Sequence, residues 1–322
     1  MLCHDGTEPG IDVQRGFPLE LLELVRCPID RGRLRADAGL ADDSLPEGTV
    51  RCETCTHVYH IRDGVLSLLD SGQLHPESAA EMRVRDQRND SILDGSRGEW
   101  RSTTTDEIEI RPTLETMGGT HGMDVCELGC GPGRYTVALA REAARVMAVD
   151  FSLSGLLVLR LKLEPAARVA LVHADVTRPY GAQASFDRVL STLHSNLPDR
   201  VHRAASLREM ACVLKDNGRA VVSMHHYSVR DLMARVPVSG RYADSGIFRY
   251  YMTARESVEE ASLFFERLRH RHIAASIPGL RNASVSRAVA RIPLMRSALG
   301  RLLLAVGEQP RRHRAVEIPQ CA

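Results

Sequence analysis

The residues best suited to chemistry lie in one glycine-rich stretch, Val125–Thr136 (VCELGCGPGRYT). Its glycines at 129, 131 and 133 let the backbone turn tightly and approach a ligand closely, because no side chain intervenes. We expect a short buried strand before the glycines and a helix after them. The free N–H groups and the positive end of that helix dipole would then face the ligand. The stretch therefore predicts a nucleotide-binding corner.

A carboxylate follows at the end of the next apolar segment, Val146–Asp150. A carboxylate at the tip of a second strand offers two acceptor oxygens, which suit the two hydroxyls of a ribose. The alternative is that Asp150 caps the helix expected over Ser154–Leu163. The presence of the glycine corner favours ribose binding.

Alternating segments position these residues. Apolar strands alternate with helices in units of roughly thirty residues, which is typical of a doubly wound parallel sheet. Ligands bind at the carboxyl ends of the strands in such sheets. We expect five side chains at that edge: Glu127, Asp150, Asp175, Ser191 and His225. Beyond the fifth strand we expect a helix over 254–268, a strand over 272–277, a helix over 284–300 and a closing strand over 302–307.

Glu127 and the G-x-G-x-G spacing together resemble motif I of the class I S-adenosylmethionine (SAM)-dependent methyltransferases. Phe186–Asp199 resembles the same family's fourth strand and exit loop, although the family's frequent histidine aligns with Asn196. The resemblance implies a Rossmann-like, doubly wound, seven-stranded α/β sheet that binds SAM, with Asp175 accepting from the adenine amino group. The implied cofactor-binding residues are Glu127, Gly129, Cys130, Gly131, Gly133, Asp150, Phe151, Ser152, Asp175, Val176 and Ser191.

Methyl transfer from SAM needs mainly proximity and alignment, and it needs a base when the acceptor is a hydroxyl or a weakly acidic nitrogen or carbon. Histidine suits that role through its near-neutral pKa. The candidates are His194, His225 and His226, with Tyr227 orienting the acceptor. The chain has 13 histidines, so chance placement of any one of them is the alternative.

A second group of chemistry-bearing residues precedes this region. Cys52 and Cys55 form one C-x-x-C half of a zinc site, and Cys27 with Asp30 occupies the position of the other half. His57 is a substitute fourth ligand. The alternative is a ribbon that has lost its metal and depends on its small core. In a cytosolic chain such cysteines indicate metal more often than disulfides.

Residues 19–69 are similar to the small zinc-ribbon domains that activate tRNA and release-factor methyltransferases. The similarity rests on the two cysteine positions and on Tyr59, Ile61, Asp63, Gly64, Leu68 and Leu69. Asp30 replaces the family's second cysteine and His60 replaces a proline. The resemblance implies a structural zinc ion.

We divide the chain into a flexible lead over 1–16, a zinc-ribbon-like domain over 17–70, and a linker with cofactor-covering helices over 71–123. The SAM-binding domain follows over 124–310, with an insert or lid over 228–252, and 311–322 form a flexible tail. Trp100, the one tryptophan, lies in the linker and is assigned either to cofactor contact or to packing.

The net charge of +1 gives no general reason to expect nucleic acid. No apolar run is long enough to span a membrane, and the polar first ten residues lack a signal-peptide pattern. We therefore expect a cytoplasmic protein without a membrane partner; the oligomeric state stays open, with a homodimer among the possibilities. Arginines are concentrated in residues 267–314, where the only acid is Glu308.

These features favour a methyltransferase acting on a small molecule, in bacterial specialised-metabolite biosynthesis. The first alternative is an rRNA guanine-N methyltransferase, since similar enzymes join a ribbon to a SAM domain and the C-terminal arginines could meet phosphates. The second is an inactive SAM-binding scaffold. The intact glycine corner and Asp150 argue against the scaffold.

Overall fold

The computed structural model describes residues 16–37, 43–98, 106–243, 245–275 and 283–312. The expected flexible lead and tail, and Trp100, lie outside these residues, apart from the ends of the two segments at residues 16, 311 and 312. Within the described residues, no helix combines the length and apolar character needed to cross a membrane.

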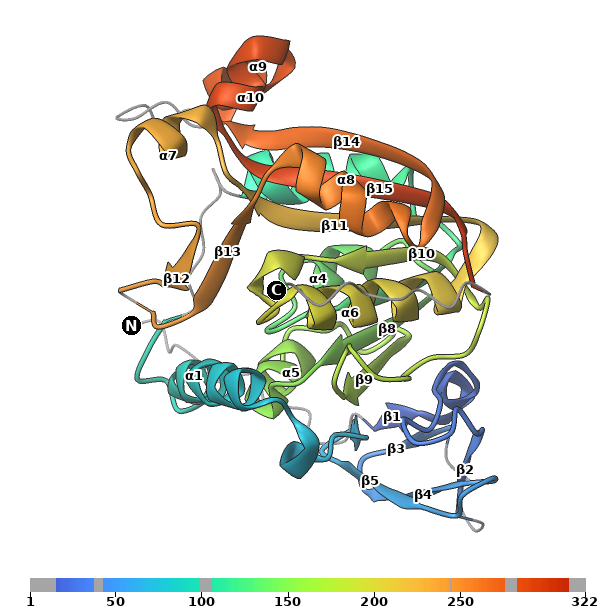
Figure 1. Ribbon diagram of the computed structural model, residues 1–322. Coiled ribbons are helices and arrows are strands. Elements are labelled where there is room, and N and C mark those ends of the chain that lie inside the picture. The colour runs from blue at the N-terminus through green and yellow to red at the C-terminus, as the bar shows by residue number, and fades with distance from the viewer. Residues whose placement is uncertain (1–15, 38–42, 99–105, 244, 276–282, 313–322) are drawn as a thin grey trace, which may run out of the picture.

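A seven-stranded sheet forms the centre of the molecule (Figure 1). Its strands in spatial order are β9 (Val169–His173), β8 (Arg145–Asp150), β7 (Asp124–Leu128), β10 (Phe186–Ser191), β11 (Leu214–His226), β15 (Gly300–Pro310) and β14 (Phe265–Ala275). The first five run parallel, and β15 runs antiparallel between β11 and β14. The prediction of a doubly wound, seven-stranded methyltransferase-type sheet is confirmed.

Both faces of this sheet are buried beneath helices. Successive side chains of a strand point to opposite faces, so each strand contributes to two apolar clusters. On β7, Cys126 packs into one apolar cluster and Val125 into the other. The first cluster is shared with α6 (Arg200–Val213) and the second with α4 (Thr136–Leu139) and α5 (Leu153–Arg160). The α3 helix (Arg111–Met117) also contributes to the second cluster, through Met117.

The ribbon extends the same sheet. Its strands are β1 (Phe17–Pro18), β2 (Leu34–Ala36), β3 (Ser44–Leu45), β4 (Gly48–Cys52), β5 (Val58–Arg62) and β6 (Val65–Ser67). A turn at Asp63 and Gly64, both at positive φ, joins β5 to β6. β6 then pairs in parallel with β9, with Val65 opposite Leu171 and Ser67 opposite His173. The ribbon therefore covers what would otherwise be an open edge of the catalytic sheet.

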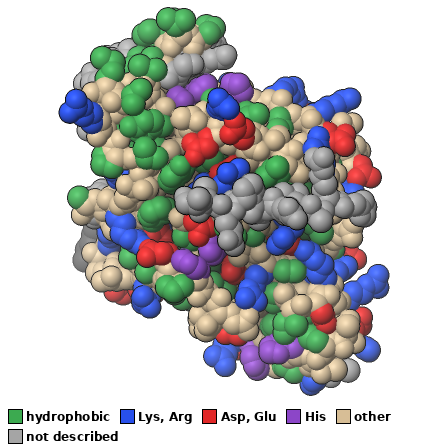
Figure 2. All heavy atoms as spheres, viewed as in Figure 1, with side chains coloured by type: hydrophobic (Ala, Val, Ile, Leu, Met, Phe, Trp, Pro, Cys, Tyr) green, Lys and Arg blue, Asp and Glu red, His purple; other side chains and the backbone are tan. Residues whose placement is uncertain are grey.

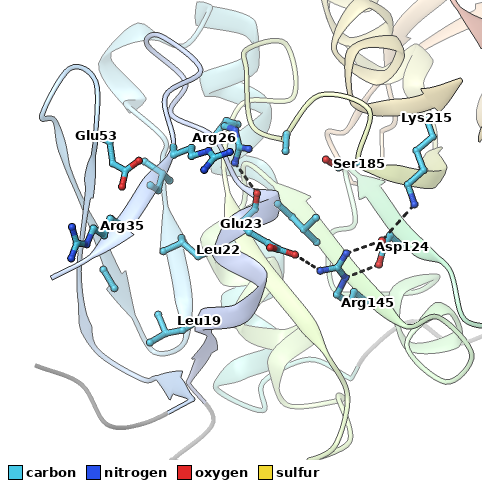
Figure 3. A pocket seen from close by; sticks show the side chains of 15 residues that line it. Leu19, Leu22, Glu23, Arg26, Arg35, Glu53, Asp124, Arg145, Ser185 and Lys215 are labelled. Atoms are coloured by element: carbon cyan, nitrogen blue, oxygen red, sulfur yellow. Dashed lines mark hydrogen bonds and ion pairs between the residues drawn. The ribbon is translucent and has the colours of Figure 1, made fainter. Parts of the chain in front are cut away.

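Ion pairs reinforce this junction (Figure 3). Glu23 of the 3-10 helix η1 (Leu19–Leu24) contacts Arg145 at 2.5 Å, and Arg145 Nε contacts Asp124 Oδ1 at 2.7 Å. Lys215 Nζ lies 3.7 Å from Asp124. This chain of charges lies at the amino ends of β7 and β8, the opposite edge from that predicted for the cofactor. We therefore regard the polar cleft of Figure 3 as part of the junction between ribbon and sheet.

The segment between β11 and α8 (Ala254–Ser262) forms a layer beside the carboxyl edge of the sheet. It contains α7 (Val229–Met233), β12 (Ser239–Arg241) and β13 (Phe248–Met252), and β13 adds in parallel to the end of β11. Arg241 contacts Glu77 and Glu81 of α1 (Pro76–Leu93) at 3.0 Å each. The insert thus bonds to the linker helix α1, which packs on α5.

Several expected element boundaries were wrong. The helix expected over 254–268 ends at Ser262, and β14 already begins at Phe265 because pairing with β15 outweighs the local helical pattern. The helix expected over 284–300 is divided into α9 (Ala283–Arg291) and α10 (Pro293–Leu299), since proline disfavours helical backbone in the residue before it. The remaining short elements are η2 (Ser71–Gln73), η3 (Asp106–Ile110) and η4 (His194–Asn196).

Candidate functional site

The glycine corner follows β7 directly. Gly129, Gly131 and Gly133 have φ of 68°, 50° and 83°, in the left-handed region that favours glycine. A Cβ on Gly133 would lie 2.1 Å from Leu159 Cδ1, so this glycine allows α5 to approach. A Cβ on Gly131 would meet nothing within 4 Å. Gly131 thus exposes bare backbone to an open space of the kind a bound ligand needs.

Asp150, at the end of β8, holds this corner. Its Oδ2 accepts a hydrogen bond of 2.7 Å from the Gly131 amide, and its Oδ1 accepts one of 2.7 Å from the Ser152 amide. Burial raises the pKa of Asp150, although both backbone bonds oppose that rise. The N-cap of α5 is Ser152, whose Oγ accepts from Gly155 N, and Asp150 is not the cap. Asp150 therefore orders the glycine loop and also lines the cavity beside that loop.

Glu127 lies behind the corner and is fully buried. Thr136 Oγ1 donates to its Oε2 at 2.7 Å, while its Oε1 has no hydrogen-bond partner among the described residues. Burial raises the pKa of Glu127 to about 8. Glu127 supports the loop through Thr136 and does not line the cavity described below, so its predicted contact with the cofactor remains a proposal.

A cavity opens in front of the glycine corner at the carboxyl edge of the sheet. Eight of the expected cofactor residues line it: Gly129, Cys130, Gly131, Asp150, Phe151, Asp175, Val176 and Ser191. Gly133 and Ser152 lie beside it in the loops already described. The cavity wall also includes five leucines and four further charged residues: Leu74, Leu128, Leu193, Leu197, Leu302, Glu81, Arg85, Glu109 and Arg134.

The linker helix α1 contributes to this site in a way that the glycine motif alone does not indicate. Ser152 Oγ donates to Asp86 Oδ1 at 2.7 Å, and Asn89 Nδ2 donates to Ser152 Oγ at 3.2 Å. Glu81 and Arg85 of the same helix line the cavity. Cofactor-covering helices were expected within residues 71–123, but the individual contacts of Asp86 and Asn89 were not predicted.

Asp175 follows β9 at the same edge. Its Oδ1 accepts from the amide and the hydroxyl of Thr177, at 2.9 Å and 2.7 Å. No bond of its Oδ2 is among those found in the described residues. An oriented carboxylate with one oxygen available can accept a hydrogen bond from an amino group. This geometry is compatible with the proposal that Asp175 binds the adenine amino group.

The three candidate bases have different surroundings. His194 is buried, and its Nε2 donates to the Arg203 carbonyl at 3.2 Å while its Nδ1 accepts from Ser191 Oγ at 3.3 Å. Burial lowers its pKa to about 3. Both ring nitrogens are therefore engaged, and a structural role in the loop after β10 is favoured.

His225 and His226 point to opposite faces of β11. His226 Nδ1 donates to the Gly300 carbonyl at 3.1 Å, and its Nε2 lies 3.3 Å from His272 Nε2, away from the cavity. His225 faces the insert, with ring centroids of Tyr251 at 5.6 Å and Tyr242 at 6.1 Å. Its Nε2 is buried without a hydrogen-bond partner, and burial lowers its pKa to about 4. Judged by the described residues, His225 alone of the three candidates retains an unengaged ring nitrogen, whereas His194 alone of the three lines the cavity.

The predicted metal ligands converge in the ribbon. Atoms of Cys27, Asp30, Cys52 and Cys55 all lie within 4.8 Å of one another. Cys27 Sγ is 3.7 Å from Cys55 Sγ, and Cys52 Sγ is 3.4 Å from Asp30 Oδ1. Three thiolates and one carboxylate form a donor set that fits tetrahedral zinc. His57, the substitute ligand, packs against Tyr59 with tilted rings and is not in this cluster.

Comparison with protein families supports both parts of the chain. Residues 125–218 match the family model described as a methyltransferase domain. Residues 19–64 match the model described as Trm112p-like protein. The chain carries a methyltransferase domain. Its N-terminal part is a Trm112p-like ribbon, so both resemblances stated for the sequence are confirmed.

Curated relatives of the methyltransferase domain include demethylmenaquinone methyltransferases. That of Clavibacter sepedonicus is 35% identical over 121 residues, which are 38% of this chain and 49% of the relative. That of Mycobacterium marinum is 34% identical over 137 residues, 42% and 52% of the two chains. The chain thus spans about half the length of the curated relatives it matches.

Solved structures with similar folds are more distant. A chain from the complex between the Haloferax volcanii Trm112 methyltransferase activator and a methyltransferase has 19% identity and a TM-score of 0.49, covering 72% of this chain and 97% of the other. The SAM-dependent methyltransferase of Mesorhizobium loti has 18% identity and a TM-score of 0.44, covering 61% and 96%.

Proposed function

We propose that this protein is an enzyme that transfers the methyl group of SAM to a small organic acceptor. The observation that carries the proposal is the pairing of Asp150 with the Gly131 amide beside an open space at the carboxyl edge of the sheet. The match of residues 125–218 to a methyltransferase domain supports it.

Several residues would hold SAM in the cavity. Asp150 would accept from the ribose hydroxyls, Asp175 Oδ2 from the adenine amino group, and Phe151 would flank the adenine ring. Gly129 and Gly131 have no side chain, so the cofactor could approach the backbone closely at these two positions. When bound, SAM supplies a methyl group on a sulfonium, which is already a good leaving group. The chain therefore needs mainly to align the acceptor and to exclude water.

His225 is the residue we propose to receive a proton from the acceptor. Its lowered pKa keeps the ring neutral at pH 7, and its Nε2 is unengaged. Tyr242 and Tyr251 of the insert flank the ring and would orient the acceptor's ring or chain. A neutral imidazole with a free lone pair can accept a proton from a hydroxyl or an acidic carbon.

The acceptor class follows from the cavity and the relatives. Leucines 74, 128, 193, 197 and 302 line the cavity, which favours an apolar acceptor. The relatives named demethylmenaquinone methyltransferases act, by name, on small molecules. We therefore propose a small lipophilic acceptor, and bacterial specialised-metabolite biosynthesis remains the proposed setting.

The rRNA alternative is less well supported by the described arginines. Arg269 contacts Glu308 at 2.9 Å, Arg271 lies 3.8 Å from Glu115, and Arg312 contacts Asp216 at 2.5 Å. Arginines held in intramolecular ion pairs are poorly placed to release counterions from phosphates. The scaffold alternative is less well supported, because residues 125–218 match a methyltransferase domain and the glycine corner with Asp150 is intact.

The test begins with calorimetric titration of SAM into the purified chain, followed by methyl transfer from labelled SAM to a panel of phenols and quinols. Asp150→Ala should weaken SAM binding by about tenfold to a hundredfold, which corresponds to one or two lost hydrogen bonds to a charged group. His225→Ala should lower kcat while leaving SAM affinity unchanged, and His226→Ala serves as the matched control. If SAM does not bind the wild-type chain, the proposed function is wrong.

A further inference from the structure

Exposed apolar side chains are concentrated at one end of the molecule. The described residues include twelve large hydrophobic side chains that are exposed, and seven of them lie between Val229 and Val238 or between Ile292 and Met295. Met233 is 81% exposed and Leu294 is 85% exposed. We call the group the apolar cap; it consists of Val229, Leu232, Met233, Val238, Ile292, Leu294 and Met295.

Two segments distant in sequence build the apolar cap. α7 contributes the first three side chains and α10 the last two, and these helices contact one another. Figure 1 shows α7, α9 and α10 at the same end, beyond the strands, and Figure 2 shows hydrophobic side chains gathered there. Large exposed apolar patches on proteins usually mark sites of interaction with another protein or a membrane.

Charge around the apolar cap indicates what it contacts. Arg230 and Arg235 are exposed on and just after α7, and the described residues give neither an acidic partner. The one acid of α7, Asp231, accepts from the Ser228 amide and hydroxyl as part of a capping box. The α9–α10 sequence adds three arginines, at 287, 291 and 296, and no acid. Exposed apolar side chains beside Arg230 and Arg235, which are also exposed, suit the headgroup region of an anionic bilayer.

The apolar cap is also close in sequence to strands of the site. α7 follows the end of β11, which carries His225, and α10 leads into β15, whose Leu302 lines the cavity. The chain therefore connects both halves of the apolar cap directly to strands of the site, β11 through His225 and β15 through Leu302.

We propose that the apolar cap docks on the surface of an anionic phospholipid membrane and that the acceptor is drawn from that membrane. The second half of this proposal rests on the proposed function; the first does not. It revises the expectation of no membrane partner, which was based on the lack of a spanning segment and did not consider surface binding.

The experiment measures co-sedimentation of the full chain with vesicles of phosphatidylcholine, with and without about one third phosphatidylglycerol. Wild type should sediment with the anionic vesicles and much less with neutral ones. Met233→Glu/Leu294→Glu should reduce the bound fraction by about tenfold, because two anchoring side chains become charged. The matched control is Leu161→Glu, since Leu161 is 53% exposed and lies outside the apolar cap.

Three outcomes would overturn membrane docking: wild type stays in solution with anionic vesicles, the double variant sediments as wild type does, or the control loses as much binding. Sedimentation velocity without lipid tests a second copy as the occupant. A wild-type dimer that the double variant abolishes, with no vesicle binding, assigns the apolar cap to self-association and refutes the proposal.

Calorimetry with SAM separates the two proposals. Vesicle binding without SAM binding would leave membrane docking standing and refute the proposed function. SAM binding without vesicle binding would refute membrane docking and leave the proposed function standing. Arg230→Gln/Arg235→Gln should weaken binding mainly at low salt, because exposed charges are screened as ionic strength rises.

Discussion

Ser67 of the ribbon and His173 of the catalytic sheet are joined by a hydrogen bond of 2.9 Å. The other ring nitrogen of His173, Nε2, donates to the Phe151 carbonyl at 3.1 Å. Since Nε2 donates to a carbonyl, Nδ1 accepts from the Ser67 hydroxyl. A single imidazole therefore connects the last ribbon strand to the segment that lines the cofactor cavity.

We predict that His173→Ala weakens SAM binding by about fivefold to tenfold, because the Phe151 backbone loses a hydrogen bond of about 1 kcal/mol. Ser67→Ala should have a smaller effect in the same direction. The control is His60→Ala, on an exposed ribbon position of β5. Calorimetric affinities equal to that of wild type would show that the ribbon does not support the cofactor end through this residue.

Gly131→Ala should abolish or strongly weaken SAM binding, because its Cβ would enter the space open to the ligand. Gly119→Ala is a matched control, since Gly119 also has positive φ (85°) and open surroundings but lies outside the cavity wall. Both changes should lower the unfolding free energy by about 1 kcal/mol through backbone strain. An equal loss of SAM affinity in the two variants would place the ligand elsewhere.

The ribbon should bind one zinc ion per chain through Cys27, Asp30, Cys52 and Cys55. Elemental analysis of purified wild type should give a ratio near one, and Cys52→Ser should reduce it to near zero. Cys212→Ser, on a cysteine outside the cluster, should leave it unchanged. A metal-free wild type prepared without chelators would refute the site, and the ribbon would then depend on its apolar core alone.

Glu127 should make stability fall as pH rises. Its folded pKa is about 8, above the ordinary value of 4.5, so the folded chain holds a proton that the unfolded chain releases between these values. The contribution is fully present below pH 4.5 and declines by about 1.4 kcal/mol per pH unit up to pH 8. Glu127→Gln, which keeps an acceptor for Thr136, should flatten that slope in urea titrations. A variant with an unchanged slope would mean that Glu127 is already ionised in the folded state.

Much of the catalytic sheet could be predicted from the sequence, because its signals are local. The segments ending at Leu128, Asp150 and Ser191 are short and rich in apolar residues, as buried parallel strands are. The glycine corner required positive φ at three positions, and only glycine adopts it freely. The four ribbon ligands were also found from spacing alone, and the structure brings all four together.

The rest depended on contacts between distant segments. The linker residues Asp86 and Asn89 reach Ser152 only because α1 packs on α5, and nothing local in the sequence specifies that docking. Similarly, His225 and His226 are adjacent in sequence but face opposite sides of β11. Which of them faces the insert depends on the register of β11 with β15 and β13. The sequence therefore indicated both histidines as candidates but did not show which one faces the insert.

The pairing of β6 with β9 also has a consequence for how the chain is made. Ser67 and His173 are 106 residues apart, so the ribbon leaves the ribosome well before its partner strand exists. During that interval its β6 edge is unpaired, and such edges invite association with other chains. Once β9 emerges, the covalently linked ribbon is present at a high effective concentration, so β6 can pair with β9 without delay. Fusion thus makes the ribbon an intramolecular folding aid, present in a fixed ratio of one to one with the sheet that it protects.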